Sequence, residues 1–243
     1  MADIIIHAFN IILYRPLLNG LILFYEHIPG HDFGIAVIVL TVLIRFVLYP
    51  LNTQGIRSQK ALQELQPKIK EIQEKYKEDR EKQSKAMIEL YQKEKINPLS
   101  GCLPLLIQLP ILIALYQVFW KGFEPGQLSN LYSFIPHPGQ INPLFLGIVN
   151  LGKPSWIMAV LVGVLQFFQT KMLTPKISKD KKQDKTAQFS DMMQKQMLYF
   201  FPIFFVLILL KLPAALSLYL IITTLFTIFQ QYLITGKFFS KNV

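Results

Sequence analysis

Five runs of apolar residues, separated by polar segments, dominate this sequence of 243 residues. A transmembrane α-helix needs about 20 consecutive, mostly apolar residues. The runs that approach this length are 34–51, 99–120, 155–173, 197–210 and 213–233. Only Lys211 and Leu212 separate the last two runs, and Pro213 is well placed to open the returning helix of a tight hairpin. The pattern predicts an all-α polytopic membrane protein with five transmembrane helices.

The N-terminal residues 1–33 are less regular, because Arg15, Pro16, Asn19 and Gly20 interrupt their apolar stretches. The segment lacks the basic start and the small-residue cleavage site of a signal peptide. An amphipathic helix that lies in the membrane interface tolerates such interruptions. We therefore expect an external, interfacial amphipathic segment, with a sixth transmembrane helix as the alternative.

The polar segment 55–97 has the apolar period of paired helices. Its apolar residues are spaced by three and four positions in turn, which is typical of a coiled-coil seam. These residues are Leu62, Leu65, Ile69, Ile72 and Tyr76. Pro67 should kink the first helix, and Asp79 and Arg80 suit a turn into a second one. The segment predicts a cytoplasmic antiparallel helical hairpin, whose charges either solvate its surface or dock a partner.

These patterns divide the whole chain into ten segments. In order, they are the N-terminal segment (1–33), the first transmembrane helix (34–54), the cytoplasmic coiled-coil hairpin (55–97), the second transmembrane helix (98–121), an external loop (122–154), the third transmembrane helix (155–175), a cytoplasmic loop (176–195), the fourth (196–211) and fifth (212–235) transmembrane helices, and a cytoplasmic tail (236–243). The external loop is rich in proline and glycine, which indicates a lid-like loop rather than a domain.

Composition supports this interpretation. The chain is 52% hydrophobic and 16% charged, whereas soluble domains are about 45–50% apolar and about 25% charged. Its net charge of +10 could indicate a nucleic acid, but the apolar content argues against DNA as a partner. The single cysteine, Cys102, excludes an internal disulfide framework.

The distribution of basic residues predicts the orientation. Most of the 25 Lys and Arg residues lie in the segments 55–97, 176–195 and 236–243. Because short Lys- and Arg-rich loops stay in the cytoplasm, we expect the N-terminus outside and the C-terminus inside a plasma membrane. A sixth span would move only the N-terminus to the inside.

Arg45 is the main candidate for intramembrane chemistry. No Asp, Glu or His falls within the five predicted spans, which argues against proton-coupled carriers and intramembrane aspartyl proteases. The sequence has no phosphate-binding loop and no nucleophile motif. We therefore expect no catalytic residue, no metal site and no cofactor.

A lone guanidinium inside a membrane needs water or neutral acceptors. The other predicted spans supply amides and hydroxyls: Gln108, Gln117, Gln166, Gln169, Thr170, Thr223, Thr224, Gln230 and Gln231. Gln166 and Gln169 are three residues apart and share a helix face. Some of these groups could instead join helix to helix. We expect a wet cavity around Arg45 that opens toward the cytoplasm.

The order of motifs resembles the YidC/Oxa/Alb family of membrane protein insertases. The matching strings are LTVLIRFVLYPL, NPLSGCLPLLIQLPILIALYQVF, LPAALSLYL and FQQYLI, and the likeness extends from about Tyr14 onward. The resemblance implies that Arg45 is the groove arginine and that Gln166 or Gln169 is its polar partner. With the polar groups of the other spans, we expect a substrate groove formed by Arg45, Gln108, Gln166, Gln169, Tyr219, Thr223 and Thr224. It also implies that the cytoplasmic hairpin is the mobile element where substrates or ribosomes first arrive. We therefore expect recruitment by the hairpin residues Leu62, Leu65, Ile69, Ile72 and Tyr76, and by Lys181 and Lys182 in the second cytoplasmic loop.

Three departures from the family pattern qualify this resemblance. The sequence has no large external β domain, so we expect a short, five-span bacterial member. Leu220 and Thr224 stand where many members have Trp and Asn, so the role of that aromatic residue cannot be carried over. The short tail after Gly236 weakens any expectation of strong ribosome binding through it.

Two functional hypotheses follow. The first is a non-enzymatic insertase that moves nascent membrane proteins into the lipid bilayer, with the ribosome and the Sec translocase as candidate partners. The second is a small channel or carrier for an anionic solute, with Arg45 as its selectivity charge. The long charged hairpin and the absence of counter-ion machinery favour the insertase.

Overall fold

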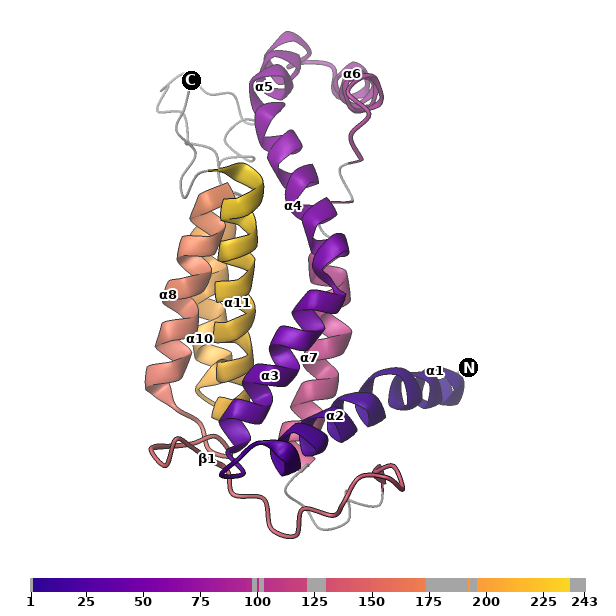
Figure 1. Cartoon of the computed structure of the whole chain (residues 1–243). Coiled ribbons are helices and arrows are strands. Elements are labelled where there is room, and N and C mark those ends of the chain that lie inside the picture. Colours follow the sequence, from indigo (N-terminus) through magenta and orange to yellow (C-terminus); the bar gives the residue numbers. More distant parts are fainter. Residues whose placement is uncertain are drawn as a thin grey trace. The chain divides into compact units, whose positions relative to one another are not determined.

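The computed structural model describes residues 2–97, 100, 103–121, 130–173, 192 and 196–236. Its elements are α1 (Ala2–Phe9), the π-helical turn η1 (Asn10–Tyr14), α2 (Arg15–His27), α3 (Phe33–Val47), α4 (Tyr49–Glu64), α5 (Gln66–Lys75), α6 (Arg80–Lys93), α7 (Leu103–Lys121), β1 (Leu144–Phe145), β2 (Val149–Asn150), α8 (Trp156–Leu173), the π-helical turn η4 (Gln196–Phe200), α10 (Phe201–Leu209) and α11 (Ala214–Thr235). The described chain is therefore mostly helical (Figure 1), with one short antiparallel strand pair, β1 and β2, in the loop expected to be external.

Apolar helices occupy all five segments for which spans were predicted. Among the described residues, Asp3–His27 and Ala214–Thr235 are each long and apolar enough to cross a membrane, and α3 and α4 pass that test as a pair. Shorter apolar helices cover Leu106–Trp120, Trp156–Met172 and Leu198–Leu209. The chain is thus an α-helical membrane protein, and five complete crossings stay a prediction.

A helix break lies inside the first predicted span, 34–54, whose membrane bounds stay a prediction. The helix α3 stops at Val47, and Leu48 has the dihedral angles of a tight turn (φ −86°, ψ 0°) before α4 begins. The physical reason is Pro50, which has no N–H and whose ring collides with the carbonyl four residues earlier. Hydropathy alone does not reveal this break. Because α3 ends at Val47, Arg45 lies in its last turn.

The N-terminal helices form one path, in which η1 joins α1 to α2 (indigo in Figure 1). Ile4, Ile5 and Ile12 are more than two-thirds exposed, whereas Leu18 and Ile22 are buried. The exposed isoleucines suit lipid contact in an interfacial helix and in a spanning helix alike. Both interpretations of residues 1–33 therefore stay open.

The described residues belong to two compact units. The first contains Met1–Leu48, Leu105–Gly163 and Phe205–Phe226. In it, side chains of α2 hold the backbone of the proline-rich loop. Asn19, which is 2% exposed, donates to the carbonyl of Asn130 (3.1 Å) and accepts from the amide of Tyr132 (2.6 Å). The hydroxyl of Tyr25 accepts from the amide of Asn142 (3.0 Å).

The same loop fixes the starts of the two helices that carry the site. Asp32 caps α3 by accepting from the amide of Ile35 (2.9 Å), and its second oxygen accepts from Leu146 (2.6 Å). At α11, the amides of Ala214 and Ala215 donate to the carbonyls of Lys153 and Leu151. The first turns of α3 and α11 thus bond to neighbouring parts of one loop.

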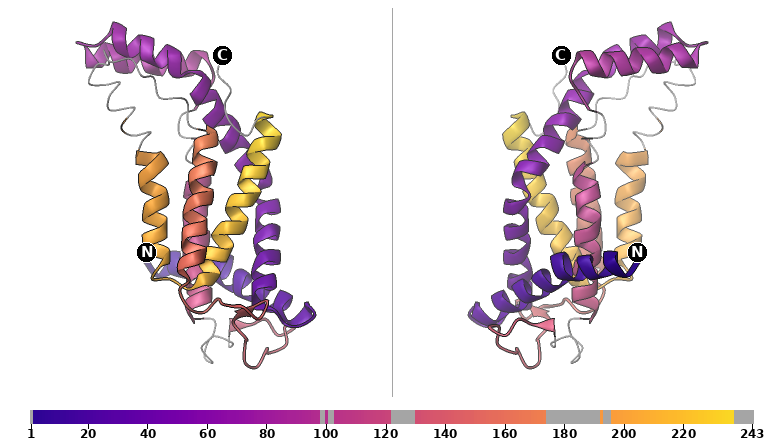
Figure 2. Two further views of the ribbon diagram at one scale, coloured as in Figure 1. Left: turned by 90° about the vertical axis from the view of Figure 1, so that its left-hand side faces the viewer. Right: turned by 90° about the vertical axis from the view of Figure 1, so that its right-hand side faces the viewer.

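The second unit contains Tyr49–Pro104, Val164–Phe204 and Thr227–Val243. We call α4, α5 and α6 its polar arm. The helices α5 and α6 lie side by side (Figure 2) and run antiparallel, because Lys68 bonds to Glu94 (2.5 Å) and the Gln83 amide donates to the carbonyl of Gln73 (3.3 Å). The first helix of the predicted hairpin breaks at Leu65, two residues before Pro67, and Asp79 caps α6.

Candidate functional site

Arg45 lies on α3 and is only 4% exposed. Its position in the last helical turn places the cation near the negative end of the helix dipole, where a positive charge is favoured. Other groups of the protein cover the guanidinium, and the wet cavity that opens toward the cytoplasm stays a prediction. Any substrate that reaches Arg45 must displace a covering group.

Hydrogen bonds join Arg45 to two other helices of the first unit. Its Nη2 donates to Oε1 of Gln108 on α7, and Nε2 of Gln108 donates to the hydroxyl of Tyr219 on α11 (2.6 Å). Tyr219 is fully buried. We call these three residues the Arg45 relay, because one amide uses its oxygen toward the cation and its nitrogen toward the phenol.

The Arg45 relay leaves the positive charge uncompensated. Within the described part of the chain, no carboxylate pairs with Arg45, and its Nε has no hydrogen-bond partner. An amide oxygen satisfies a donor but does not cancel a charge, and screening is weak away from water. The relay therefore holds a cation that can still attract an anion.

The other predicted groove residues divide between the two units. Thr223 and Thr224 are buried on α11, and Thr223 lies one turn beyond Tyr219 on the same helix face. Gln166 and Gln169 are half-buried on α8 and belong to the second unit. Their predicted place opposite Arg45 stays a prediction.

Sequence reasoning missed Ser217 on α11. This residue is fully buried and its hydroxyl has no hydrogen-bond partner among the described residues, as is also true of the Thr224 hydroxyl and the Gln231 side-chain oxygen. These three residues recur every seven positions and so form one stripe of the helix. The heptad spacing, read beyond glutamine and threonine to serine, would have found Ser217.

The polar arm has a modest apolar seam. Leu65 and Ile69 are buried, whereas Leu62, Ile72 and Tyr76 are half-buried. The short α5 does not sustain a coiled coil over several heptads. Lys181 and Lys182, the other predicted recruitment residues, lie outside the described residues.

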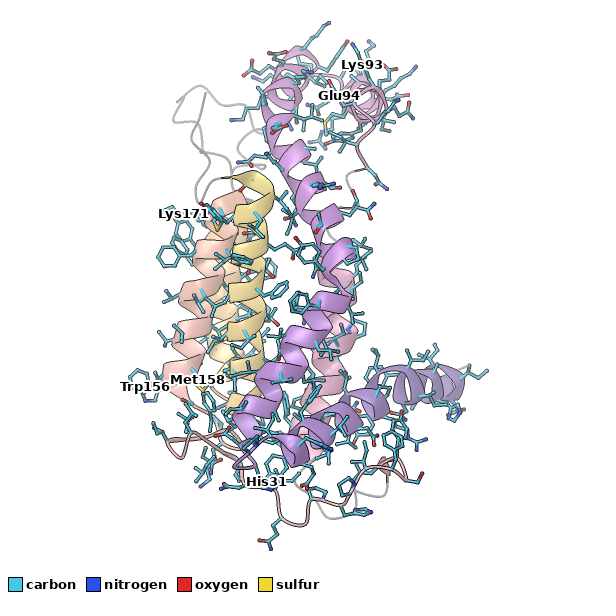
Figure 3. All side chains as sticks on the ribbon, viewed as in Figure 1. His31, Lys93, Glu94, Trp156, Met158 and Lys171 are labelled. Atoms are coloured by element: carbon cyan, nitrogen blue, oxygen red, sulfur yellow. The ribbon has the colours of Figure 1, made fainter. Side chains whose placement is uncertain are left out.

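Within the arm, ion pairs lie at both ends of the antiparallel pair formed by α5 and α6. Near the end of α6, where Figure 3 labels Lys93 and Glu94, the ammonium of Lys68 hydrogen-bonds to Glu94 and lowers the pKa of that carboxyl. At the turn, the hydrogen bond from Lys82 lowers the pKa of Asp79. Both pairs are exposed to solvent, so water screens them.

Comparisons with known proteins place the chain in a family. The family described as 60Kd inner membrane protein matches residues 23–241. A protein named membrane protein insertase YidC from Psychromonas ingrahamii is 38% identical over 231 residues, which cover 94% of this chain and 36% of that protein. The proteins of the same name from Geobacter metallireducens and Geobacter sulfurreducens are 36% and 35% identical, covering 90% and 91% of this chain and 36% and 37% of their own. The chain thus spans a little over a third of the length of these relatives.

Proposed function

Because the chain belongs to the 60Kd inner membrane protein family, we propose that it is a membrane protein insertase. In this proposal it receives nascent membrane proteins in a hydrophilic intramembrane groove that opens to the cytoplasm, and passes them into the lipid bilayer. It breaks no covalent bond and so is not an enzyme. The names of its relatives support the activity, and its residues support the mechanism below.

The observation that carries the mechanism is the buried Arg45 with a neutral partner. A buried arginine paired with a carboxylate is costly to separate, because each charge would be left alone. Gln108 instead satisfies a guanidinium N–H without cancelling its charge. An incoming carboxylate or carbonyl can take the place of that amide, and a charged acceptor forms the stronger bond.

This exchange would lower the barrier for moving a polar tail. An acidic side chain loses its hydration when it enters the membrane, which is strongly unfavourable without a compensating charge. Arg45 compensates part of that loss while the apolar segment of the substrate moves into lipid. When the tail leaves on the far side, Gln108 closes on the guanidinium again.

The remaining predicted groove residues would hydrate the path. Thr223, Thr224, Gln166 and Gln169 supply hydroxyls and amides, which bind either water or a passing main chain. The Thr224 hydroxyl, which has no hydrogen-bond partner among the described residues, supports this role, because buried polar atoms without protein partners are commonly satisfied by water. None of these groups carries charge, so none would trap a substrate.

The orientation and the partners form the second part of the proposal. The protein would lie in a bacterial plasma membrane with its N-terminus outside and its C-terminus in the cytoplasm, which the positions of the basic residues support. The polar arm would then project into the cytoplasm, where substrates, the ribosome or the Sec translocase would first meet it.

Site-specific crosslinking during translation tests the groove. A photoreactive residue at Thr41, which is buried one turn before Arg45, should crosslink to a single-span nascent substrate. The matched control is Leu43, which lies on the same helix but is 48% exposed. Equal crosslinking from both positions would mean that the substrate has no preferred path along the Arg45 face.

A flux assay separates the insertase from the anion carrier. Purified protein in liposomes should not transport small anions in the absence of a nascent chain. Steady anion flux that disappears in Arg45→Ala would support the carrier and would contradict the insertase mechanism.

A further inference from the structure

Side-chain hydrogen bonds from Gln230 join α11 to α4. It is fully buried, and its Nε2 donates to the carbonyl of Tyr49 (3.0 Å) and to the hydroxyl of Thr53 (2.7 Å). The hydroxyl of Thr53 donates in turn to the same Tyr49 carbonyl (2.9 Å). All three residues belong to the second unit, so this cluster is one local structure.

The cluster lies at the base of the polar arm. Tyr49 is the first residue of α4 and follows directly on the break at Leu48. A helix that starts after such a break has no helical hydrogen bond to hold it across the interruption. A side chain from another helix that bonds the first carbonyl of α4 therefore restrains where the arm begins.

Geometry makes Gln230 suited to this restraint. It lies eleven residues, or about three helical turns, beyond Tyr219, so the two side chains share one face of α11. The helix α11 therefore carries Tyr219, which belongs to the Arg45 relay, and Gln230, which bonds to α4, about 16 Å apart along its axis. One helix thus bonds to both the Arg45 relay and the base of the polar arm.

We propose that Gln230 is a positioning residue that anchors the base of the polar arm to α11. The role of the arm in receiving substrate rests on the proposed function, whereas the anchoring itself does not. The anchor is neutral and directional: it needs two donors from one nitrogen, which Gln provides and which Leu or Glu at this position would lack. It was predicted from the sequence only as one of several amides available to Arg45, and its two bonds instead go to α4.

The adjacent Gln231 provides a matched control. It has the same chemistry and is 1% exposed, but no hydrogen bond joins its side chain to α4 within the described part of the chain. Gln231→Leu therefore tests the general effect of removing a buried amide from this end of α11. Thr53→Val removes one partner of Gln230 and keeps the shape of that side chain.

The test measures the distance between α4 and α11 with paired spin labels in lipid nanodiscs. Arg57 on α4 and Leu233 on α11 are both exposed and both in the second unit, so each can be replaced by a labelled cysteine in a Cys102→Ser background. We expect a narrow distance distribution in the parent protein and in Gln231→Leu. The distance distribution should become broad in Gln230→Leu and should broaden partly in Thr53→Val.

Each outcome decides one part of the proposal. Broadening in Gln230→Leu with an unchanged thermal unfolding midpoint supports anchoring, and an accompanying loss of substrate insertion that Gln231→Leu does not show supports positioning. An unchanged distribution in folded Gln230→Leu overturns the anchor. Broadening without loss of insertion overturns the positioning role, whereas a parent protein that inserts no substrate at all counts against the proposed function and leaves the anchor measurement standing.

Discussion

Arg45 in the first unit is 4% exposed and bonds to a neutral amide, whereas Lys68 in the polar arm has a side chain that is 54% exposed and bonds to a carboxylate. The two cations therefore have opposite surroundings and opposite partners. In water, an ion pair is weak and reversible, because solvent screens it and competes for both groups. In a low-dielectric interior the same pair would be tight and slow to open.

This difference explains where charge is balanced in the chain. The segment 55–97, which contains most of the arm, holds eight acids and eleven bases, and its ion pairs can form and break in solvent. The helices α3, α7, α8, α10 and α11 contain no Asp or Glu, so their one buried arginine has only neutral groups to bond. A site meant to release its ligand gains from such a partner, and the following experiments test that reasoning.

Arg45→Ala should have the largest effect. A hydrogen bond to a charged group contributes about 1.5–3 kcal/mol, so we expect insertion of a substrate with two or more acids in its tail to fall about tenfold or more. Arg45→Lys separates the effect of the positive charge from that of the guanidinium geometry, because lysine keeps the charge but loses the planar set of donors. Insertion assays at matched protein level measure both, and wild-type rates in Arg45→Ala would end the groove mechanism.

Gln108→Glu should give Arg45 a carboxylate partner, as Lys68 and Lys82 of the arm have. The new carboxylate would form a buried ion pair with Arg45, and a pair of this kind costs about 3–5 kcal/mol to break by removing one partner. We expect the unfolding midpoint to hold or rise while insertion of acidic substrates falls several-fold. Gln117→Glu makes the same change elsewhere on α7 and is the control. Normal insertion in Gln108→Glu would show that the neutral partner is not needed.

Removal of residues 63–93, with a short linker in their place, tests the polar arm instead of the interior site. Because the pairs of the arm are local to α5 and α6, we expect the apolar helices to fold and the protein level to stay normal. Insertion in cells should decrease by a smaller factor than in Arg45→Ala. If the deletion instead abolishes the protein, the arm supports folding and its recruitment role fails.

Acidification should have the smallest effect, confined to the arm. The Lys68 ammonium holds the pKa of Glu94 below its ordinary value, so the stabilisation is complete above the ordinary pKa and is lost as pH falls through the lowered one. A nitroxide at Ser84 on α6 should gain mobility over that acidic range. Lys68→Ala should reduce the pH dependence and leave the part that comes from Asp79 at the start of α6. An equal response in that variant would assign the whole effect to another group.

The sequence predicted the local features of the structure well. Apolar runs located the helices, Pro67 marked the break in the arm, and Asp79 and Arg80 marked its turn, where Asp79 also caps α6. Arg45 and Gln108 were recognised as groove candidates because a charge in a membrane requires a polar partner. The same hydropathy pattern did not reveal the break after α3, although Pro50 follows it in the sequence, because an apolar run does not show where a helix bends.

Long-range bonds could not be predicted. Asn19 was interpreted as an interruption of an apolar stretch, yet it bonds to backbone 111 and 113 residues away. Gln230 is similarly 181 residues from Tyr49. Helical periodicity describes which residues share a face, but it carries no information about which distant backbone that face meets.

The loop bonded by Asn19, Tyr25 and Asp32 has a consequence for the order of assembly during synthesis. Its partners on α2 and before α3 are made 111–117 residues earlier, which at about 5–20 residues per second is a delay of roughly 6–23 s. During that interval the buried amide of Asn19 has no loop to bind, so the first helices wait in an unfinished state while α7 is made. A ribosome that pauses before residue 130 would therefore prolong the exposure of this polar surface, and a substitution that weakens the loop would harm newly made chains more than finished ones.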